Sequence, residues 1–296
     1  MDPTDFAETL GFAILGILSA QTIVGLAYLH GTGVEQSEHE GVKWLTKAAN
    51  QNEPLALYEL GNLYALGKYY TKNIVEAVKL WTRAAELHNA DAQLNIGYCY
   101  NKGNGVEKNI NTALHWWERA ANQNHAIAQF ELGSYYFNER NYARAITELT
   151  RSAINGYAKA QHQLGIIFYQ GYGTDKNEKE GIRLFQLAAD QGFALSEAII
   201  AQFLFYGDGM EKDLKAAYKY MKKAASKGNA LAQSMMPKIM ASMELRTCAN
   251  CNKVEPSFGT FKCCNGCKVP RYCSVECQKE HWKSTHKPEC KKINSK

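Results

Sequence analysis

The sequence lacks the short motifs that mark many active sites. Its 296 residues contain no nucleophile elbow, no glycine-rich phosphate loop and no paired-carboxylate motif. No flexible Gly/Ser linker separates the cysteine-rich end of the chain from the part before it. These absences argue against an enzyme, and they predict that the parts of the chain are joined directly.

The first residues also lack the features of a secretory signal. The stretch MDPTDFAE contains three acidic residues and no basic one, whereas a signal peptide begins with positive charge. Residues 11–29 contain no charged side chain and are long enough to cross a membrane as one helix. Because the repeats described below divide this run between two helices with a turn near Gly16, we expect no membrane span.

Cysteine is almost absent before residue 248. Cys99 is the single exception, and we expect it to be a small core residue. The other eight cysteines lie between Cys248 and Cys290. Metal ligation requires thiolates, so the cluster predicts a reducing compartment, the cytoplasm or the nucleus.

The spacing of these cysteines fits zinc ligation. Seven thiols and one imidazole make eight ligands, enough for two closed tetrahedral Zn²⁺ sites, which leave no position for a catalytic water. Cys263 is a spare thiol in this interpretation, because Cys264 has the usual two-residue gap to the next cysteine. His281 lacks the helical offset to the last cysteine. The predicted ligands are Cys248, Cys251, Cys264, Cys267, Cys273, Cys277, His286 and Cys290.

Positive charge is concentrated in residues 246–296. They contain eleven Lys/Arg against four Asp/Glu, whereas residues 1–245 carry a net charge of −2. Seven zinc-bound thiolates and two Zn²⁺ ions would bring the metal-loaded segment to about +4. We interpret the basic residues chiefly as compensation for anionic zinc–thiolate centres, with nucleic-acid binding as the alternative.

A repeat of 36 residues accounts for most of the chain before the cysteine cluster. The pattern [LIV]-G-x-x-[YF] recurs at steps of 36, 36, 36, 32 and 36 residues, and its sixth copy is degenerate. An alanine pair, once Ser-Ala, follows each copy with the same period. Two independent markers with one period predict a solenoid of two-helix units. The glycine slot of the pattern is occupied by Gly25, Gly61, Gly97, Gly133, Gly165 and Ala201.

Each unit contains the signals of two helices. The first helix stops at Gly-x-Gly, as at Gly103 and Gly105, because glycine tolerates the left-handed backbone that ends a helix. The second helix carries a small residue, a bulky residue and the alanine pair. Small residues let the two backbones approach closely, and the Trp, Tyr and Phe positions are expected to be core between repeats rather than a ligand site. The 32-residue unit has no Gly-x-Gly and predicts a shortened turn.

The pattern fades at both ends. Residues 3–16 keep the register of an eroded second helix, and a methionine-rich helix disturbed by Pro237 precedes the cysteines. We expect these methionines to seal the stack, with a partner groove as the alternative. The expected division is an N-terminal cap (1–17), a solenoid with a C-terminal capping helix (18–245), and a zinc-binding segment with a basic tail (246–296).

Two resemblances follow from these residues. The consensus A-x-x-x-[LI]-G-x-x-Y-x-x-G-x-G followed by A-x-x-W-x-x-A-A resembles the SEL-like repeat, a relative of the tetratricopeptide repeat. The terminal cysteine pattern resembles the MYND zinc finger between Cys248 and Cys290. Together they imply an all-α fold, an α/α superhelical solenoid followed by a small zinc-stabilised finger.

The MYND resemblance implies two interleaved zinc sites. It also implies docking of a short proline-containing peptide beside a small β-hairpin near Tyr272 and Ser274, with Gln278 and Trp282 lining the peptide groove. Packing of Trp282 against the zinc sites is the alternative for that residue. One departure from the family is the three-residue gap between Trp282 and His286, where two is commoner. The implied sites are Cys248, Cys251, Cys273 and Cys277 for one ion, and Cys264, Cys267, His286 and Cys290 for the other.

These resemblances predict a non-catalytic adaptor or scaffold whose partners are proteins. SEL-like solenoids hold partner segments on a face lined by the first helices, so the solenoid is expected to hold a second partner. MYND fingers also occur in lysine methyltransferases with a SET domain, but the repeats leave no room for such a catalytic fold. The second alternative is a transcription-related regulator that binds nucleic acid through the basic finger. It is less favoured because no helix presents side chains spaced to read bases.

Overall fold

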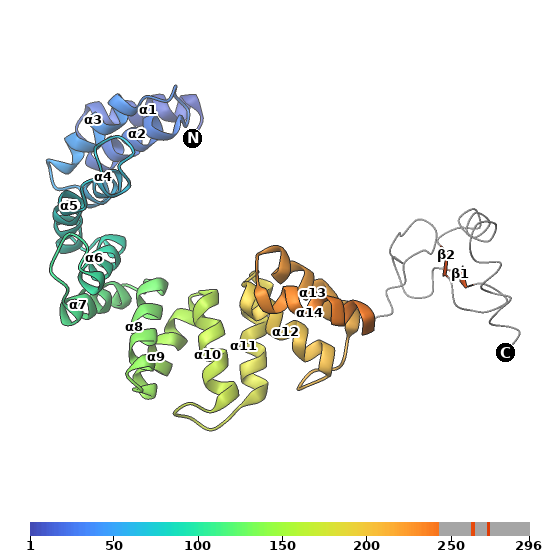
Figure 1. The fold of residues 1–296 in the computed structure, drawn as a ribbon. Helices are drawn as coiled ribbons and strands as arrows, with labels where there is room; N and C mark the ends of the chain where they lie inside the picture. Colours follow the sequence, from blue (N-terminus) through green and yellow to red (C-terminus); the bar gives the residue numbers. More distant parts are fainter. Residues whose placement is uncertain (243–261, 264–270, 273–296) are drawn as a thin grey trace, which may run out of the picture. The chain divides into compact units, whose positions relative to one another are not determined.

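The computed structural model describes residues 1–242, 262–263 and 271–272 (Figure 1). The structure divides into two compact units, Met1–Asn177 and Glu178–Lys296. The first unit contains α1 (Pro3–Ile14), α2 (Leu18–His30), α3 (Glu38–Ala49), α4 (Pro54–Leu66), α5 (Ile74–Glu86), α6 (Ala90–Lys102), α7 (Ile110–Asn122), α8 (Ala126–Asn138), α9 (Tyr142–Ile154) and α10 (Ala158–Gln170). The second contains α11 (Glu178–Asp190), α12 (Ala194–Tyr206), α13 (Leu214–Ser226), α14 (Ala230–Ser242), β1 (Lys262–Cys263) and β2 (Arg271–Tyr272).

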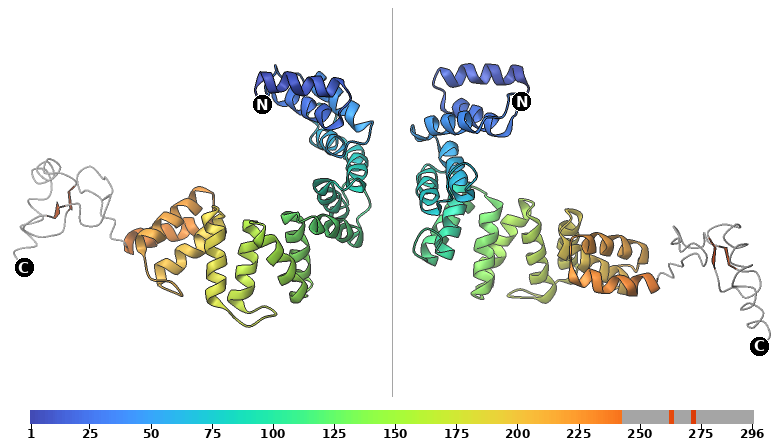
Figure 2. Two further views of the ribbon diagram at one scale, coloured as in Figure 1. Left: turned by 180° about the vertical axis from the view of Figure 1, so that it is seen from behind. Right: turned by 45° about the horizontal axis from the view of Figure 1, so that its top comes forward.

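Within each unit the helices pack in chain order. Each helix from α1 to α9 contacts the next one, and so does each helix from α11 to α13 (Figure 2). The even-numbered helices α2 to α12 are the first helices of the repeats, and the odd-numbered helices α3 to α13 are the second helices. The all-helical solenoid predicted from the repeat period is therefore confirmed.

The first helices end where the glycines predict. Gly103 ends α6 with a left-handed φ of 74°, and its N–H donates to the Cys99 carbonyl at 2.8 Å. The second glycine of the motif, Gly105, also has a φ of 74°. A Cβ at Gly105 would lie 3.0 Å from the carbonyl oxygen of Ile74, in the second helix of the preceding repeat. The first glycine therefore ends the helix, and the second lets the turn approach its neighbour.

The second helices begin at side-chain caps. The Asn73 side chain accepts a hydrogen bond from the backbone N–H of Glu76 at 3.1 Å, which satisfies a free donor at the start of α5. The backbone N–H of Asn73 also donates to the carbonyl of Tyr64 in α4 at 2.9 Å. One residue thus starts the second helix and fixes the turn to the first. The same arrangement recurs at Ser37, Asn109 and Asp213.

The glycine slot permits close contact between the two helices of a repeat. A Cβ at Gly61 would lie 2.5 Å from the indole nitrogen of Trp81, so any larger residue would displace the ring. Trp81 is 6% exposed, and its indole N–H donates to the Tyr58 carbonyl at 3.2 Å. Gly97 meets Trp117 in the same way. The expectation that these aromatics form core is confirmed, and Cys99 is buried beside them.

The repeat of 32 residues differs where the sequence predicts. Only residues 139–141 separate α8 from α9, whereas residues 103–109 separate α6 from α7. Arg140 takes a positive φ of 59° in the short turn, in place of a glycine. The shortened turn is therefore confirmed, and α8 and α9 still pack as a pair.

The N-terminal run without charges is divided between two helices. α1 ends at Ile14, and α2 begins at Leu18 after Gly16, which has a φ of 93°. This division confirms the turn predicted from the register of the repeats. No helix in the described part of the chain is long and apolar enough to span a membrane.

The last described helix continues through a proline. α14 includes Pro237, which occupies the glycine slot of a seventh unit, and runs on to Ser242. The expected disturbance at the proline therefore does not end the helix. Met235, Met236 and Met240 are half-buried, and Met243 lies outside the described residues.

Candidate functional site

The predicted zinc ligands and most of the predicted peptide-binding residues lie outside the described residues. Tyr272 is the exception among them, and only its backbone is described. It belongs to β2, where its Cα pairs with that of Lys262 in the antiparallel strand β1. In sequence, the two strands flank the segment that holds Cys264 and Cys267.

The donor set of the C-terminal segment fits zinc. Thiolate and neutral imidazole are the ligands that Zn²⁺ binds in closed tetrahedral sites, and eight of them occur at compatible spacing. Among the residues that the structure describes, no group of three or more His, Cys, Asp and Glu side chains could hold a metal ion. The C-terminal cysteines therefore remain the one candidate metal centre that the sequence indicates.

The first helices of the first unit present a row of polar side chains at fixed register. The row occupies two positions in each of α4, α6, α8 and α10, one lying two residues before the glycine slot and the other one residue after it. In α10 the second of these positions holds the apolar Ile166, which is not part of the row. All of its members are half-buried. We call this row the first-helix stripe, and it consists of Glu59, Asn62, Asn95, Tyr98, Glu131, Ser134 and Gln163.

Hydrogen bonds join neighbouring helices along the first-helix stripe. The Tyr98 hydroxyl of α6 donates to Glu131 Oε1 of α8 at 2.6 Å. The Ser134 hydroxyl of α8 donates to Gln163 Oε1 of α10 at 2.8 Å. Burial, followed by the hydrogen bond to Glu131, raises the pKa of Tyr98 far above its ordinary value, so the hydroxyl remains a donor. Hydrogen bonds thus link the stripe from α6 through α8 to α10.

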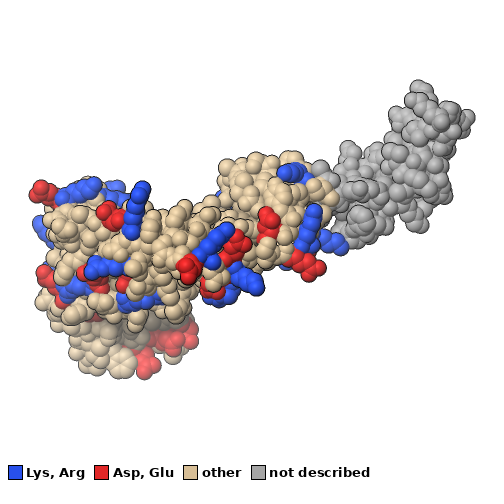
Figure 3. Space-filling model, turned by 90° about the horizontal axis from the view of Figure 1, so that it is seen from below, with Lys and Arg blue, Asp and Glu red and all other residues tan. Residues whose placement is uncertain are grey.

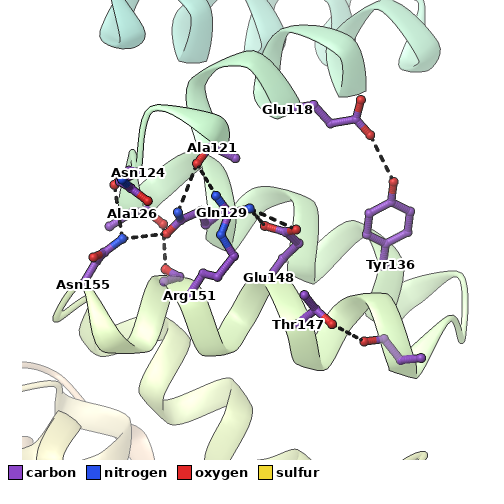
Figure 4. Close-up of polar contacts among 12 residues, drawn as sticks. Glu118, Ala121, Asn124, Ala126, Gln129, Tyr136, Thr147, Glu148, Arg151 and Asn155 are labelled. Carbon is purple, nitrogen blue, oxygen red and sulfur yellow. Dashed lines mark hydrogen bonds and ion pairs between the residues drawn. The ribbon is translucent and has the colours of Figure 1, made fainter.

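A second polar system lies buried where one repeat meets the next. In Figure 4 the Ala121 carbonyl at the end of α7 accepts hydrogen bonds from the Gln129 amide at 3.1 Å and from Arg151 at 2.7 Å. The Asn155 amide donates to Gln129 Oε1 at 2.9 Å. Because Gln129 is fully buried, these bonds satisfy both ends of its amide. The joint between the third and fourth repeats is therefore fixed by polar contacts as well as by packing.

The same joint recurs with different chemistry. Gln93 replaces Gln129 in the previous repeat, and it accepts from Gln123 at 2.8 Å. In the sixth repeat the slot holds Glu197, whose partner is Lys227. The second repeat has leucine at both positions. These pairs were not foreseen from the sequence, although a glutamine four residues before the glycine slot recurs with the period of the repeat at Gln21, Gln93, Gln129 and Gln161.

Figure 3 shows charges of both signs mixed on the described surface, with areas of other residues between them. Lys and Arg alternate with Asp and Glu on the described helices in this view. Several charged side chains of the described helices form pairs along one helix, such as Lys79 with Glu76 at 3.0 Å and Arg183 with Glu180 at 2.7 Å. Exposed pairs of this kind add little stability, so they indicate a solvated face rather than a site.

Comparison with family models identifies both parts of the chain. The Sel1 repeat matches residues 18–53, 54–89, 90–125, 126–146, 158–193 and 194–229. The chain therefore belongs to the Sel1 repeat family. The MYND finger matches residues 248–290, so a zinc-binding MYND finger follows the repeats.

Solved structures support the same fold. A protective antigen of uropathogenic Escherichia coli with an SLR fold is 28% identical, with a TM-score of 0.69, over 81% of this chain and 52% of the antigen. A Sel1 repeat protein from Oxalobacter formigenes is also 28% identical, with a TM-score of 0.65, over 74% of this chain and 87% of that protein. This chain thus spans about half the length of the first protein and most of the second.

One curated protein is similar over a short segment. Ubiquitin carboxyl-terminal hydrolase 15 of Arabidopsis thaliana is 45% identical over 53 residues, which are 18% of this chain and 5% of the hydrolase. A match of this extent relates one small segment of the two proteins.

Proposed function

We propose that this protein is a non-catalytic adaptor, in which the MYND finger captures a proline-containing peptide and the Sel1 solenoid holds a second protein. The observation that carries the proposal is the direct succession of two interaction modules, with family matches at residues 18–229 and 248–290. The expected domain division is 1–17, 18–245 and 246–296. We expect the protein to act in the cytoplasm or the nucleus, where thiolates remain reduced.

The solenoid contributes surface rather than chemistry in this proposal. Several of its titratable groups are paired, either along one helix, as Glu76 is with Lys79, or between the two helices of a repeat, as Glu197 is with Lys227. Its polar first-helix stripe is half-buried and is hydrogen-bonded from α6 to α10, which suits recognition of a partner segment. Stacked helices keep such a surface rigid, so little ordering is needed on binding.

The finger contributes a second binding surface. We propose two Zn²⁺ ions, one held by Cys248, Cys251, Cys273 and Cys277 and the other by Cys264, Cys267, His286 and Cys290. Interleaved ligands would fold a segment too short for a hydrophobic core of its own. The peptide would lie along Tyr272, Ser274, Gln278 and Trp282, because an extended proline-containing peptide loses little entropy on binding.

Substitution of Trp282 in the full-length protein tests the proposal. Trp282→Ala should weaken capture of proline-containing peptides by about tenfold, as expected for the loss of an aromatic anchor, with zinc content and helicity unchanged. Leu66→Ala is the matched control, because Leu66 is a large apolar side chain that is 73% exposed on the solenoid. The control should bind as the parent does.

The other outcomes assign different roles. Loss of zinc from the Trp282→Ala variant would make Trp282 a structural residue and move the peptide site elsewhere. Binding equal to that of the parent would remove peptide docking from the function of the finger. Salt-sensitive binding of DNA or RNA by the parent, in place of peptide, would favour the nucleic-acid alternative.

A further inference from the structure

The first-helix stripe contains two carboxylates that lack a cationic partner within the described part of the chain. Glu59 and Glu131 form no ion pair among these residues, whereas Glu76, Glu148 and Glu180 each pair with a basic residue three positions later on the same helix. Glu59 accepts one hydrogen bond, from Asn62 at 3.3 Å, and Glu131 accepts one from Tyr98 at 2.6 Å. An ionised carboxylate can accept about four, so both retain free acceptor capacity.

The neighbouring side chains hold these carboxylates in place. The Trp81 indole N–H donates to Asn62 Oδ1 at 3.2 Å, and an indole can only donate. The amide nitrogen of Asn62 is therefore directed to Glu59, which fixes that carboxylate above α4. Tyr98 fixes Glu131 on α8 in the same manner. Both acids are preorganised and half-buried, so a cation that meets them gains more than it would at an exposed acid.

Other side chains of the stripe can hydrogen-bond to the backbone of an extended peptide. Asn95 and Gln163 carry amides, which offer both a donor and an acceptor and can pair with the N–H and C=O of a peptide. The stripe itself contains no Lys or Arg. The Lys and Arg residues of α4, α6, α8 and α10 are Lys102 and Lys159, which are exposed near the ends of α6 and α10. The acidic Asp91 of α6 is hydrogen-bonded to His125 at 3.1 Å. The charge that faces a ligand on the stripe is negative.

We propose that the first-helix stripe binds an extended segment of a partner protein that carries two Lys or Arg residues. Glu59 and Glu131 receive the two cations, and the amides of Asn95 and Gln163 pair with the backbone between and beyond them. The carboxylates lie two repeats apart, on α4 and α8. Taking about 10 Å from one first helix to the next, we place them about 20 Å apart, and an extended chain rises about 3.3 Å per residue. The basic residues of the segment therefore lie about six positions apart. This inference rests on the proposed adaptor function and names the partner chemistry of its solenoid.

Peptide pools and charge-neutral variants of the full-length protein test this proposal. The probes are fluorescent pools of twelve-residue peptides without proline, randomised except for Arg fixed at the third and ninth positions. Matched pools carry Glu at these positions, or two adjacent Arg. The variants are Glu59→Gln and Glu131→Gln, which keep size and hydrogen bonding. Glu86→Gln and Glu107→Gln are controls, because both residues are exposed and outside the stripe.

The parent should bind the spaced-Arg pool more tightly than either other pool, and the binding should weaken as salt rises. Each stripe variant should lose about fivefold in affinity for that pool, as expected for a charge-assisted hydrogen bond at a half-buried site, and the controls should lose nothing. Circular dichroism should show parent-like helicity in all four variants.

Four outcomes would overturn the inference. Equal binding of the spaced-Arg and Glu pools would remove the role of charge, and unchanged affinity in the Glu59→Gln and Glu131→Gln variants would place the ligand elsewhere. Binding of the Glu pool alone, abolished by Asn95→Ala, would keep the solenoid as a partner site and reject the basic segment. If no pool binds while the finger still captures proline-containing peptides, the inference fails together with the solenoid half of the adaptor function.

Discussion

The ammonium group of Lys227 lies 2.9 Å from both carboxylate oxygens of Glu197. Glu197 is 1% exposed, and the Lys227 side chain is 42% exposed, so a cation enters from the surface to meet a buried acid. The same ammonium group donates to the Gly192 carbonyl at 2.7 Å. Lys227 thus joins the end of α13 to the start of α12 and to the turn that precedes it.

Removing one member of this pair should destabilise the solenoid more than removing both. Lys227→Gln leaves Glu197 buried without a cation, and it should lower the free energy of unfolding by about 2 kcal/mol. This loss is smaller than that for a fully buried pair because Lys227 is partly exposed. Adding Glu197→Gln to this variant recreates the amide pair that Gln93 and Gln123 form, and it should recover most of that loss. A double-mutant cycle from thermal unfolding measures the coupling. Additive effects would show that the two residues act independently.

The glycine slot should reject even a methyl group. A Cβ at Gly97 would overlap the indole ring of Trp117, which is 2% exposed and cannot move outward freely. Gly97→Ala should therefore destabilise the protein by about 1–3 kcal/mol through overpacking. Gly11→Ala is the control, because nothing lies within 4 Å of a Cβ there and Gly11 is inside α1. The control should stabilise by up to about 1 kcal/mol. Equal thermal midpoints for the two variants would contradict the assigned contact.

Stability should fall in mild acid because of His162. Burial lowers the pKa of this histidine from 6.5 to about 4, so the folded protein favours the neutral ring. The unfolded chain binds a proton near pH 6.5, and the folded one only near pH 4. The stability that the neutral His162 ring contributes is therefore fully present above pH 6.5 and is lost as the pH falls toward 4. His162→Phe, which copies Phe130 at the same register, should reduce the drop in thermal midpoint between about pH 7.5 and about pH 5. The exposed His30→Gln is the control.

The finger should bind two zinc ions per chain and fold apart from the helices. Metal analysis should give two Zn²⁺ for the parent, a reduced content for Cys264→Ser, and the parent content for Cys263→Ser. A chelator should remove both ions and leave most of the helical circular dichroism intact, because each repeat is stabilised by its neighbours. Loss of all helix on chelation would show that the finger and the solenoid fold as one unit. One Zn²⁺ per parent chain would reject the assignment of eight ligands.

The fold could be predicted from the sequence because single residues of each repeat determine where its helices begin, end and pack closely. Gly103 ends α6, Asn109 starts α7, and Gly97 admits Trp117, and each is a requirement of a single position that recurs with the period. The turn at Gly16 followed from register alone, although hydropathy favoured one long helix. The finger was identified by ligand spacing, and the described part of the chain includes only its two short strands.

The residues of the proposed interaction surface could not be predicted in the same way. The first-helix stripe unites side chains that are unlike one another, such as Tyr98 and Glu131, so no periodic pattern of residue type marks it. Its continuity depends on which side chains reach across to the next helix, and this is known only from the structure.

The variation among the buried joints makes the repeats non-interchangeable. A solenoid whose repeats all carried the same pair could fold with its first helices shifted by one unit relative to its second helices, since every first helix would find an equally good partner. In this protein such a shift would place Lys227 beside a glutamine and leave Glu197 without its cation, or set Leu57 against an amide. Each of these mismatches buries an unsatisfied polar group, which is costly. The amide, leucine and charged pairs therefore differ enough to favour a single pairing of first with second helices along the chain.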